Sequence, residues 1–306
     1  MRFSAANKTN YQNMPRINPS DPDSGQLRKS ILAPAGHLLV IADSSQVEDR
    51  MNCYVSGQQD ILDAYAQGED AYKLQAARIY FNSKLEDITK AQRFLGKVAR
   101  LGLGYGCGRL KFAHIVRAGL MGPPVDISDN EASSIVRSYR KSNSNIVGFW
   151  DVCTDFIRYM NAGEVQEYKA PGTNKVLFTS GKNFLMMPNG LKLHYSKLSI
   201  SPHNEDATYI GRSEARIKIY GALLSENIIQ CLARIAVISQ IMHVAEAHPD
   251  LHLALLVHDE GVFIASRKTA SKILEELILS MQTAPDWCST LPFGAEGMVS
   301  RYYAKP

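Results

Sequence analysis

The sequence predicts a mixed α/β (α+β) fold, with an antiparallel sheet of short apolar strands and a mostly helical insertion. Residues 37–42 are a short run rich in branched apolar residues, which is typical of a buried strand. Two further apolar runs, 251–257 and 261–265, are joined by only three residues and therefore predict a hairpin. Helical periodicity fills most of the chain between the first strand and this hairpin.

The remaining elements follow from residues that start and stop helices. Residues 163–212 show short alternating runs with Gly, Pro and Asn, and Met187-Pro-Asn-Gly190 predicts a hairpin turn within them. A short strand is expected close to the C-terminus. Helices are expected over the following stretches: 46–80 with breaks near Gly57 and Gly68, 89–105 with Thr89 or Asp87 as N-cap, 129–161, 213–245 and 268–281.

The composition is that of an ordinary soluble globular protein, with 45% hydrophobic and 21% charged residues among 306. No uninterrupted apolar run reaches the roughly 18–20 residues of a membrane span, and no secretory leader is evident, so we expect a cytoplasmic protein without a membrane partner. The net charge of +4, from 34 Lys and Arg against 30 Asp and Glu, fits a polyanionic partner without requiring one.

Cysteine and histidine spacings give no sign of a disulfide framework or a zinc site. The five cysteines are far apart and form no C-x-x-C pair, so we expect reduced thiols. His243, His248 and His252 are close in sequence, but their spacing does not place all three on one helical face.

Acidic residues follow the apolar strands at two places. Asp43 closes the run 37–42, and Asp259 with Glu260 lies at the tip of the C-terminal hairpin. Because a carboxylate is costly to bury, a divalent cation is a natural partner for such residues. If the strands are neighbours in one sheet, Asp43 and Asp259 converge and can hold two Mg²⁺ ions for in-line nucleotidyl transfer. The alternative is that hairpin turns simply favour Asp.

A stripe of cations lies along the helix expected over 89–105. Arg93, Lys97 and Arg100 are spaced i, i+4 and i+7, and Leu101 and Tyr105 continue the same face. Fixed cations beside an apolar or aromatic platform suit a nucleoside triphosphate, with the cations on the phosphates and the platform against the base. The alternative is a solvated basic edge above a core stripe.

Taken together, these segments resemble the bacterial DNA polymerase I family (family A), in a phage-type form. The segment Asp43-Ser-Ser-Gln-Val-Glu-Asp-Arg50 is similar to the first polymerase motif, D-Y-S-Q-I-E-L-R. Arg93-x-x-x-Lys97 followed by Tyr105-Gly106 resembles the second motif, and His258-Asp259-Glu260 resembles the H-D-E hairpin of the third. The motifs occur in the order of the family, and the resemblance extends over essentially the whole chain.

The resemblance implies the palm and fingers of a DNA-directed DNA polymerase that uses two-metal-ion nucleotidyl transfer. The palm would comprise residues 1–68 and 213–306, and the fingers 69–212. The cofactor would be Mg²⁺, two ions, with Mn²⁺ able to substitute, and the partners would be primer-template DNA and a dNTP. The implied site residues are Asp43, Ser44 (through its carbonyl) and Asp259 for metal; Asp43, Asp259, Glu260 and Lys97 for catalysis; Arg93, Lys97, Leu101, Tyr105, Glu48 and Gln46 for substrate; and Arg2, Arg28, Gln230 and His258 for DNA.

Several positions depart from the family pattern. Ser44 stands where Tyr is usual, Leu101 replaces the aromatic ring that stacks on the nucleotide, and Arg100 replaces a small polar residue. The family places a thumb, and often an exonuclease, before the first motif. We therefore expect a fragment or a split-polymerase subunit whose partner chain supplies them.

Two other classes of protein remain as alternatives. A non-catalytic nucleic-acid-binding subunit could keep this fold, but it would not need the acidic pair and the triphosphate cations together. A single-subunit RNA polymerase or a reverse transcriptase shares the palm, but Glu48 and the H-D-E tip argue against both.

Overall fold

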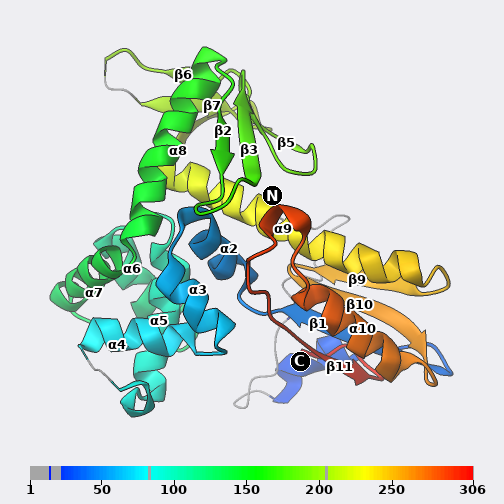
Figure 1. The fold of residues 1–306 in the computed structure, drawn as a ribbon. Helices are drawn as coiled ribbons and strands as arrows, with labels where there is room; N and C mark the ends of the chain where they lie inside the picture. Colours follow the sequence, from blue (N-terminus) through cyan, green and yellow to red (C-terminus); the bar gives the residue numbers. More distant parts are fainter. Residues whose placement is uncertain (1–13, 15–21, 82–83, 204–205, 306) are drawn as a thin grey trace. The chain divides into compact units, whose positions relative to one another are not determined.

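The computed structural model describes residue 14 and residues 22–81, 84–203 and 206–305 (Figure 1). The chain divides into two compact units. The sheet unit is the described part of Met1–Val47 with Gln230–Pro306, and the helical unit is the described part of Glu48–Ile229. The palm and fingers boundaries expected from the family resemblance stay a prediction.

The sheet unit is built on a four-stranded antiparallel sheet in the order β11-β1-β10-β9. The two strands at its centre are the ones that the sequence placed beside the acidic residues. In their register Asp43 lies opposite Glu260 and, on the other side, opposite Glu296. The strands are β1 (His37–Ser44), β9 (His252–Val257), β10 (Glu260–Ser266) and β11 (Ala295–Ser300).

Both faces of this sheet are covered. Helix α10 (Ala270–Gln282) packs against β1 and β11 (Figure 1). Close packing also joins the sheet to α9 (Gly221–Ala247), because a Cβ atom added at Gly261 would lie 2.9 Å from Ile241 Cδ1. An apolar cluster brings strand residues together with the segments next to both chain ends; its buried members are Met14, Ala33, Leu39, Ile41, Val262 and Tyr303. The described part of the unit also contains the short helices η2 (Pro22–Gly25), α1 (Gln26–Lys29) and η4 (Asp286–Cys288).

Helix α9 is a core helix. Among the described residues it is the one helix long and apolar enough to cross a membrane, with a mean hydropathy of 1.6 over its most apolar window. However, 61% of that window is buried within the protein. Its apolar character is therefore explained by packing.

The helical unit begins with a series of short helices whose ends follow the sequence signals. Gly57 and Gly68 adopt positive φ angles of 73° and 74°, which separate the first three helices at the expected places. Thr89 and Gln92 form the capping box that starts α5. The helices are α2 (Val47–Ser56), α3 (Gln59–Ala66), α4 (Ala71–Tyr80), η3 (Leu85–Asp87), α5 (Lys90–Leu103), α6 (Arg109–Arg117), α7 (Asp129–Ser142) and α8 (Ser144–Ala162).

Small antiparallel sheets follow α8 and confirm the expected hairpin region. The packing of β2 and β3 on α8 is aromatic, with the rings of Tyr168 and Phe178 stacked 4.9 Å apart and Phe156 edge-on to both. One sheet has the order β2-β3-β4-β5 and the other β6-β7-β8. The strands are β2 (Glu167–Lys169), β3 (Val176–Gly181), β4 (Phe184–Met186), β5 (Lys192–His194), β6 (Ser199–Ile200), β7 (Ala207–Ile210) and β8 (Arg216–Ile219).

The expectation of a helix from residue 213 was wrong. Residues 216–219 form β8, which pairs with β7, and α9 begins only at Gly221. Glu214 has a φ of 58°, a left-handed conformation that closes the turn between the two strands. Ile217 and Ile219 then alternate with polar residues, which is the period of a strand.

The contact between α4 and α5 depends on a glycine. A Cβ atom at Gly96 would lie 2.9 Å from the backbone nitrogen of Ala76 and would collide with the carbonyl oxygen of Tyr72. We therefore expect Gly96→Ala to separate the two helices and to lower the free energy of unfolding by about 1–3 kcal/mol, measured by urea denaturation. Gly102→Ala is the matched control on the same helix, because nothing lies within 4 Å of its added Cβ. It should be neutral or stabilise by up to about 1 kcal/mol. Equal effects of the two substitutions would contradict this account of the α4–α5 contact.

Candidate active site

The structure brings Asp43 and Asp259 together in the sheet unit. Asp43 lies near the end of β1, and Asp259 lies in the loop between β9 and β10. Because β1 and β10 are neighbours, the backbone nitrogen of Ser44 donates a hydrogen bond to the Asp259 carbonyl oxygen at 3.0 Å. The Asp43 side chain is 15% exposed, and no residue that the structure describes donates a hydrogen bond to its buried Oδ1.

The backbone next to both aspartates is in an unusual conformation. His258 precedes Asp259 in a two-residue hairpin loop and has a φ of 56°. Gln46, just beyond β1, has a φ of 49°. Residues other than glycine rarely adopt this left-handed region, and such positions occur often at functional sites. The conformation leaves the His258 and Gln46 side chains exposed.

The electrostatics of the pair favour binding of a cation. Burial raises the pKa of Asp259, the charge of Asp43 raises it further, and Lys305 opposes both. The Lys305 ammonium lies 2.7 Å from Asp43 Oδ2. The charged form of Asp259 is therefore disfavoured by its surroundings, and a cation bound beside it would stabilise that form.

A hydrogen bond from Tyr303 holds the side chain of Glu260. Its side chain is buried, and the Tyr303 hydroxyl donates a hydrogen bond of 2.5 Å to Oε1. Burial raises the pKa of Glu260, while the hydrogen bond from Tyr303 lowers it. The Arg28 guanidinium lies 5.0 Å from the centre of the Tyr303 ring and donates to the Met14 carbonyl oxygen at 3.0 Å.

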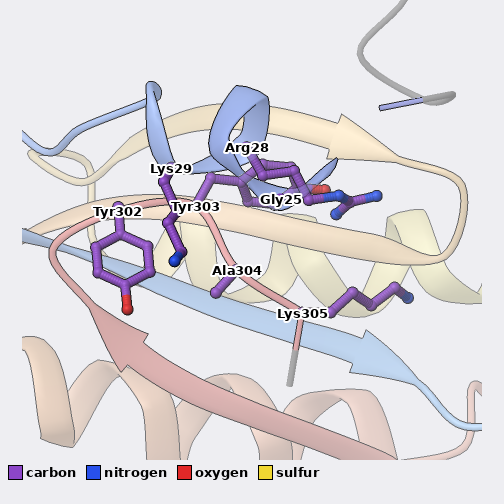
Figure 2. A pocket seen from close by; sticks show the side chains of 7 residues that line it. All are labelled: Gly25, Arg28, Lys29, Tyr302, Tyr303, Ala304 and Lys305. Carbon is purple, nitrogen blue, oxygen red and sulfur yellow. The ribbon is translucent and has the colours of Figure 1, made fainter. Parts of the chain in front are cut away.

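A basic and aromatic pocket adjoins these residues. Figure 2 shows the side chains that line it, with Arg28 beside Tyr303 and Lys29 extended toward Tyr302. Its volume is about 270 Å³, and Gly25, Ala304 and Lys305 complete the lining. The pocket therefore combines three cationic side chains with two tyrosine rings, the groups that contact phosphates and bases in nucleic-acid sites.

Helix α5 of the helical unit carries the residues expected to hold a triphosphate. Arg93 is half-buried, and its Nε atom lies 2.5 Å from Asp70 Oδ2, while its guanidinium lies 5.4 Å from the centre of the Tyr72 ring. Lys97 and Leu101 are half-buried further along the helix. These side chains are accessible in part, as a binding role requires.

The structure corrects the assignment of Arg100 to this cationic stripe. Its side chain is fully buried and pairs with Asp49 of α2 at 2.6 Å. Burial alone would lower the pKa of Arg100, but the Asp49 carboxylate raises it, and the result lies well above the ordinary value. Arg100 is therefore a permanently charged core residue.

The remaining predicted site residues lie at separate places. Burial raises the pKa of Tyr105, and the nearby Glu48 carboxylate raises it further, so these two side chains are electrostatic neighbours in the helical unit. Gln230 is half-buried on α9. Arg2 lies outside the residues that the structure describes.

Sequence reasoning missed Lys305, Tyr303 and the Asp49–Arg100 pair. Lys305 is 262 positions from its partner, and no local pattern signals such a contact. Across the residues the structure covers, no three or more His, Cys, Asp or Glu side chains are grouped to hold a metal ion. A cation here would therefore rest on the two aspartates, with further oxygen ligands from a carbonyl, water or substrate.

Comparison with known proteins gives a consistent result. The family model for DNA polymerase family A matches residues 2–167, which is more than half of the chain. A DNA polymerase of Bacillus phage SP02 is 29% identical over 91% of this chain and 43% of its own length. DNA polymerase I of Helicobacter pylori is 24% identical over 89% of this chain and 26% of its own. The chain thus spans less than half the length of these relatives.

A solved structure shares the fold. The POL domain of Pol1 from M. smegmatis, in complex with DNA primer-template and dNTP, matches with a TM-score of 0.68 and 18% identity, over 97% of this chain and 45% of that one. The antiparallel sheet and the helices described above therefore follow the fold of that domain. On the extent of the family match, the chain belongs to DNA polymerase family A.

Proposed function

We propose that this chain catalyses the template-directed addition of deoxynucleotides to a primer 3′ end, with release of pyrophosphate. The observation that carries the proposal is the pair of Asp43 and Asp259 at one end of the central strands β1 and β10, with the Lys305 ammonium beside Asp43. The relatives named above are DNA polymerases, and their family supports the same reaction here. Their bacterial and phage origin supports the bacterial cytoplasm as its compartment.

The donor atoms at this pair fit magnesium. Mg²⁺ binds through one or two carboxylates and keeps its other positions for water and substrate phosphates. Asp43, Asp259 and the Ser44 carbonyl would hold two ions, and Mn²⁺ would substitute. Bound there, the metal would lower the pKa of the primer 3′-hydroxyl and neutralise charge on the triphosphate.

The chain's own residues would bind and orient the substrates. Arg93 and Lys97 would hold the triphosphate, and Lys97 would give its proton to the departing pyrophosphate. Leu101 and Tyr105 would lie against the base and Gln46 near the nucleotide. Glu260, fixed by Tyr303, would act as an accessory acid near the primer end.

DNA would be bound mainly through shape and charge. Arg28, Gln230 and His258 would contact the primer or the minor groove, and the basic pocket of Figure 2 offers further cations for phosphates. Arg2 keeps the same proposed role. Such contacts release counterions, so binding should weaken steeply as salt rises.

Replacing Asp259, one of the two paired aspartates, tests the proposal. In single-nucleotide primer extension at low salt with Mg²⁺, Asp259→Ala should lower incorporation about a thousandfold or more, because a metal ligand supplies several kcal/mol of transition-state stabilisation. Asp250→Ala is the matched control, because this exposed aspartate lies just before β9, at the other end of the strand from Asp259. It should extend primers as the parent chain does.

Other outcomes separate the alternatives. Full incorporation by Asp259→Ala would overturn the assignment of the site. DNA binding that is indifferent to Mg²⁺ and dNTP, with no extension even when a thumb-bearing partner chain is added, would identify a non-catalytic nucleic-acid-binding subunit.

We also propose, from the family resemblance, that Glu48 is a sugar gate that blocks a ribose 2′-hydroxyl, and this role gives a second test. If Glu48 excludes a ribose 2′-hydroxyl, Glu48→Ala should raise the relative use of rNTP over dNTP about tenfold or more, because a shape-based exclusion is worth about 1–3 kcal/mol. Ratios of kcat/KM for matched dNTP and rNTP measure this effect. The control is Glu69→Ala, an exposed glutamate of the same unit, which should leave the ratio unchanged. An unchanged ratio in Glu48→Ala would remove Glu48 from this role.

A further inference from the structure

A buried ion pair joins the helix of the proposed sugar gate to the helix of the proposed triphosphate site. Arg100 Nε and Nη2 donate hydrogen bonds to the two carboxylate oxygens of Asp49, at 2.6 and 2.9 Å. The side chains of Arg100 and Asp49 are 0% and 2% exposed. This two-point contact fixes the orientation of the guanidinium as well as its distance from α2.

Surrounding helices satisfy the rest of the pair. The Tyr65 hydroxyl donates to Asp49 Oδ2 at 2.5 Å, and Arg100 Nη1 donates to Asn143 Oδ1 at 3.0 Å. Asn143 is in turn oriented by Gln75, because Asn143 Nδ2 donates a hydrogen bond of 2.9 Å to Gln75 Oε1. The pair is thus held from α3, α4 and the junction of α7 with α8, so neither side chain can turn away without leaving buried polar atoms unpaired.

Both members of the pair depart from the family pattern. Asp49 stands at the Leu position of the motif D-Y-S-Q-I-E-L-R that residues 43–50 resemble, and the same resemblance implies a small polar residue at the position of Arg100. The two departures make direct contact and have opposite charge. A buried ion pair is weak evidence for a stabilising role, because apolar residues of similar volume often serve a core as well or better.

We propose that the Asp49–Arg100 pair positions α5 against α2 and thereby sets the separation between Glu48 and the triphosphate-binding residues. Asp49 follows Glu48 directly in α2, and Arg100 lies one helical turn after Lys97 in α5. A shift of α5 along or about its axis would move Lys97 relative to Glu48, and the ion pair opposes both movements. The inference rests on the proposed function, since Glu48 and Lys97 have their roles only there.

The test removes the charges and keeps the volume. Asp49→Leu combined with Arg100→Met replaces the pair by apolar residues, so it avoids the stranded buried charge that either single substitution would leave. Arg100→Lys keeps the charge but loses the two-point contact. The control is Asp60→Asn combined with Arg78→Met, which removes a half-exposed ion pair between α3 and α4 of the same unit.

We expect the Asp49→Leu, Arg100→Met variant to fold, with a cooperative thermal transition. Its dNTP KM should rise about tenfold and its preference for dNTP over rNTP should fall about tenfold, because small misplacements of binding groups cost one to two orders of magnitude. Its kcat at saturating dNTP should change less. Arg100→Lys should fall between this variant and the parent, and the control pair should match the parent in KM and sugar preference.

Tryptophan fluorescence gives a readout that does not need turnover. Trp150 Nε1 donates to the Gly104 carbonyl oxygen at 3.1 Å, so the indole reports the C-terminal end of α5. In a Trp287→Phe background, where Trp150 is the remaining tryptophan, the emission of the Asp49→Leu, Arg100→Met variant should differ from that of the parent before nucleotide is added. Titration with dNTP and Mg²⁺ should then reach saturation at about tenfold higher dNTP, in line with its KM.

The outcomes are distinct. This inference alone would be overturned by the following pair of results: the parent chain extends primers, and the folded Asp49→Leu, Arg100→Met variant has the same dNTP KM, sugar preference and Trp150 titration as the parent. A parent chain that neither extends primers nor responds to dNTP, with or without a thumb-bearing partner, would overturn the proposed function and this inference with it.

Discussion

The buried guanidinium of Arg100 constrains how the helices of the helical unit meet one another. A charge taken out of water must be met by an opposite charge and by hydrogen bonds for its remaining donors. Asp49, Asn143 and the Cys53 sulfur provide these partners from α2 and from the junction of α7 with α8. Because these groups are far apart in sequence, the helices must come together in one arrangement before the charge is satisfied. The core of this unit is therefore specified by a polar contact as well as by apolar packing.

In the sheet unit, by contrast, the acidic side chains are close together and only partly compensated by positive charge. Asp43, Asp259 and Glu260 lie close together, and Lys305 is the ammonium group that faces Asp43 among the described residues. Burial and mutual repulsion raise the pKa of Asp259, so this charge is poorly compensated by the protein itself. Satisfied charges hold a structure together, whereas under-compensated ones are suited to bind an ion or a substrate. The contrast between the two units thus separates a structural ion pair from a candidate catalytic one.

Local signals predicted most of the elements, and long-range contacts mark where the prediction stopped. Apolar runs gave the strands, Gly57 and Gly68 gave the helix breaks, and Thr89 gave the start of α5. Helical periodicity placed Arg100 and Arg93 on one face of α5, and the two do share a face. Periodicity does not show how deeply each position along the helix is buried. Arg93 meets Asp70 near the surface, whereas Arg100 meets Asp49 in the core. The contact of Lys305 with Asp43 joins the two ends of the chain, so no window of sequence contains it.

Helix α5 is held by close contacts at two positions along its length, and these contacts limit how it can move when a nucleotide binds. Near its middle, Gly96 lets α4 approach so closely that a single methyl group would not fit. One turn further, Arg100 is tied to α2. Lys97 lies between these two contacts, so its backbone is held on both sides. Beyond Leu103 the chain leaves the helix but stays packed: Gly104 is the C-cap, its carbonyl oxygen accepts a hydrogen bond from Trp150, and a Cβ atom at Gly106 would lie 2.6 Å from Ala222 Cβ. Because Gly96 ties α5 to α4 and Arg100 ties its last turn to α2, a displacement of α5 on nucleotide binding should carry these two helices with it.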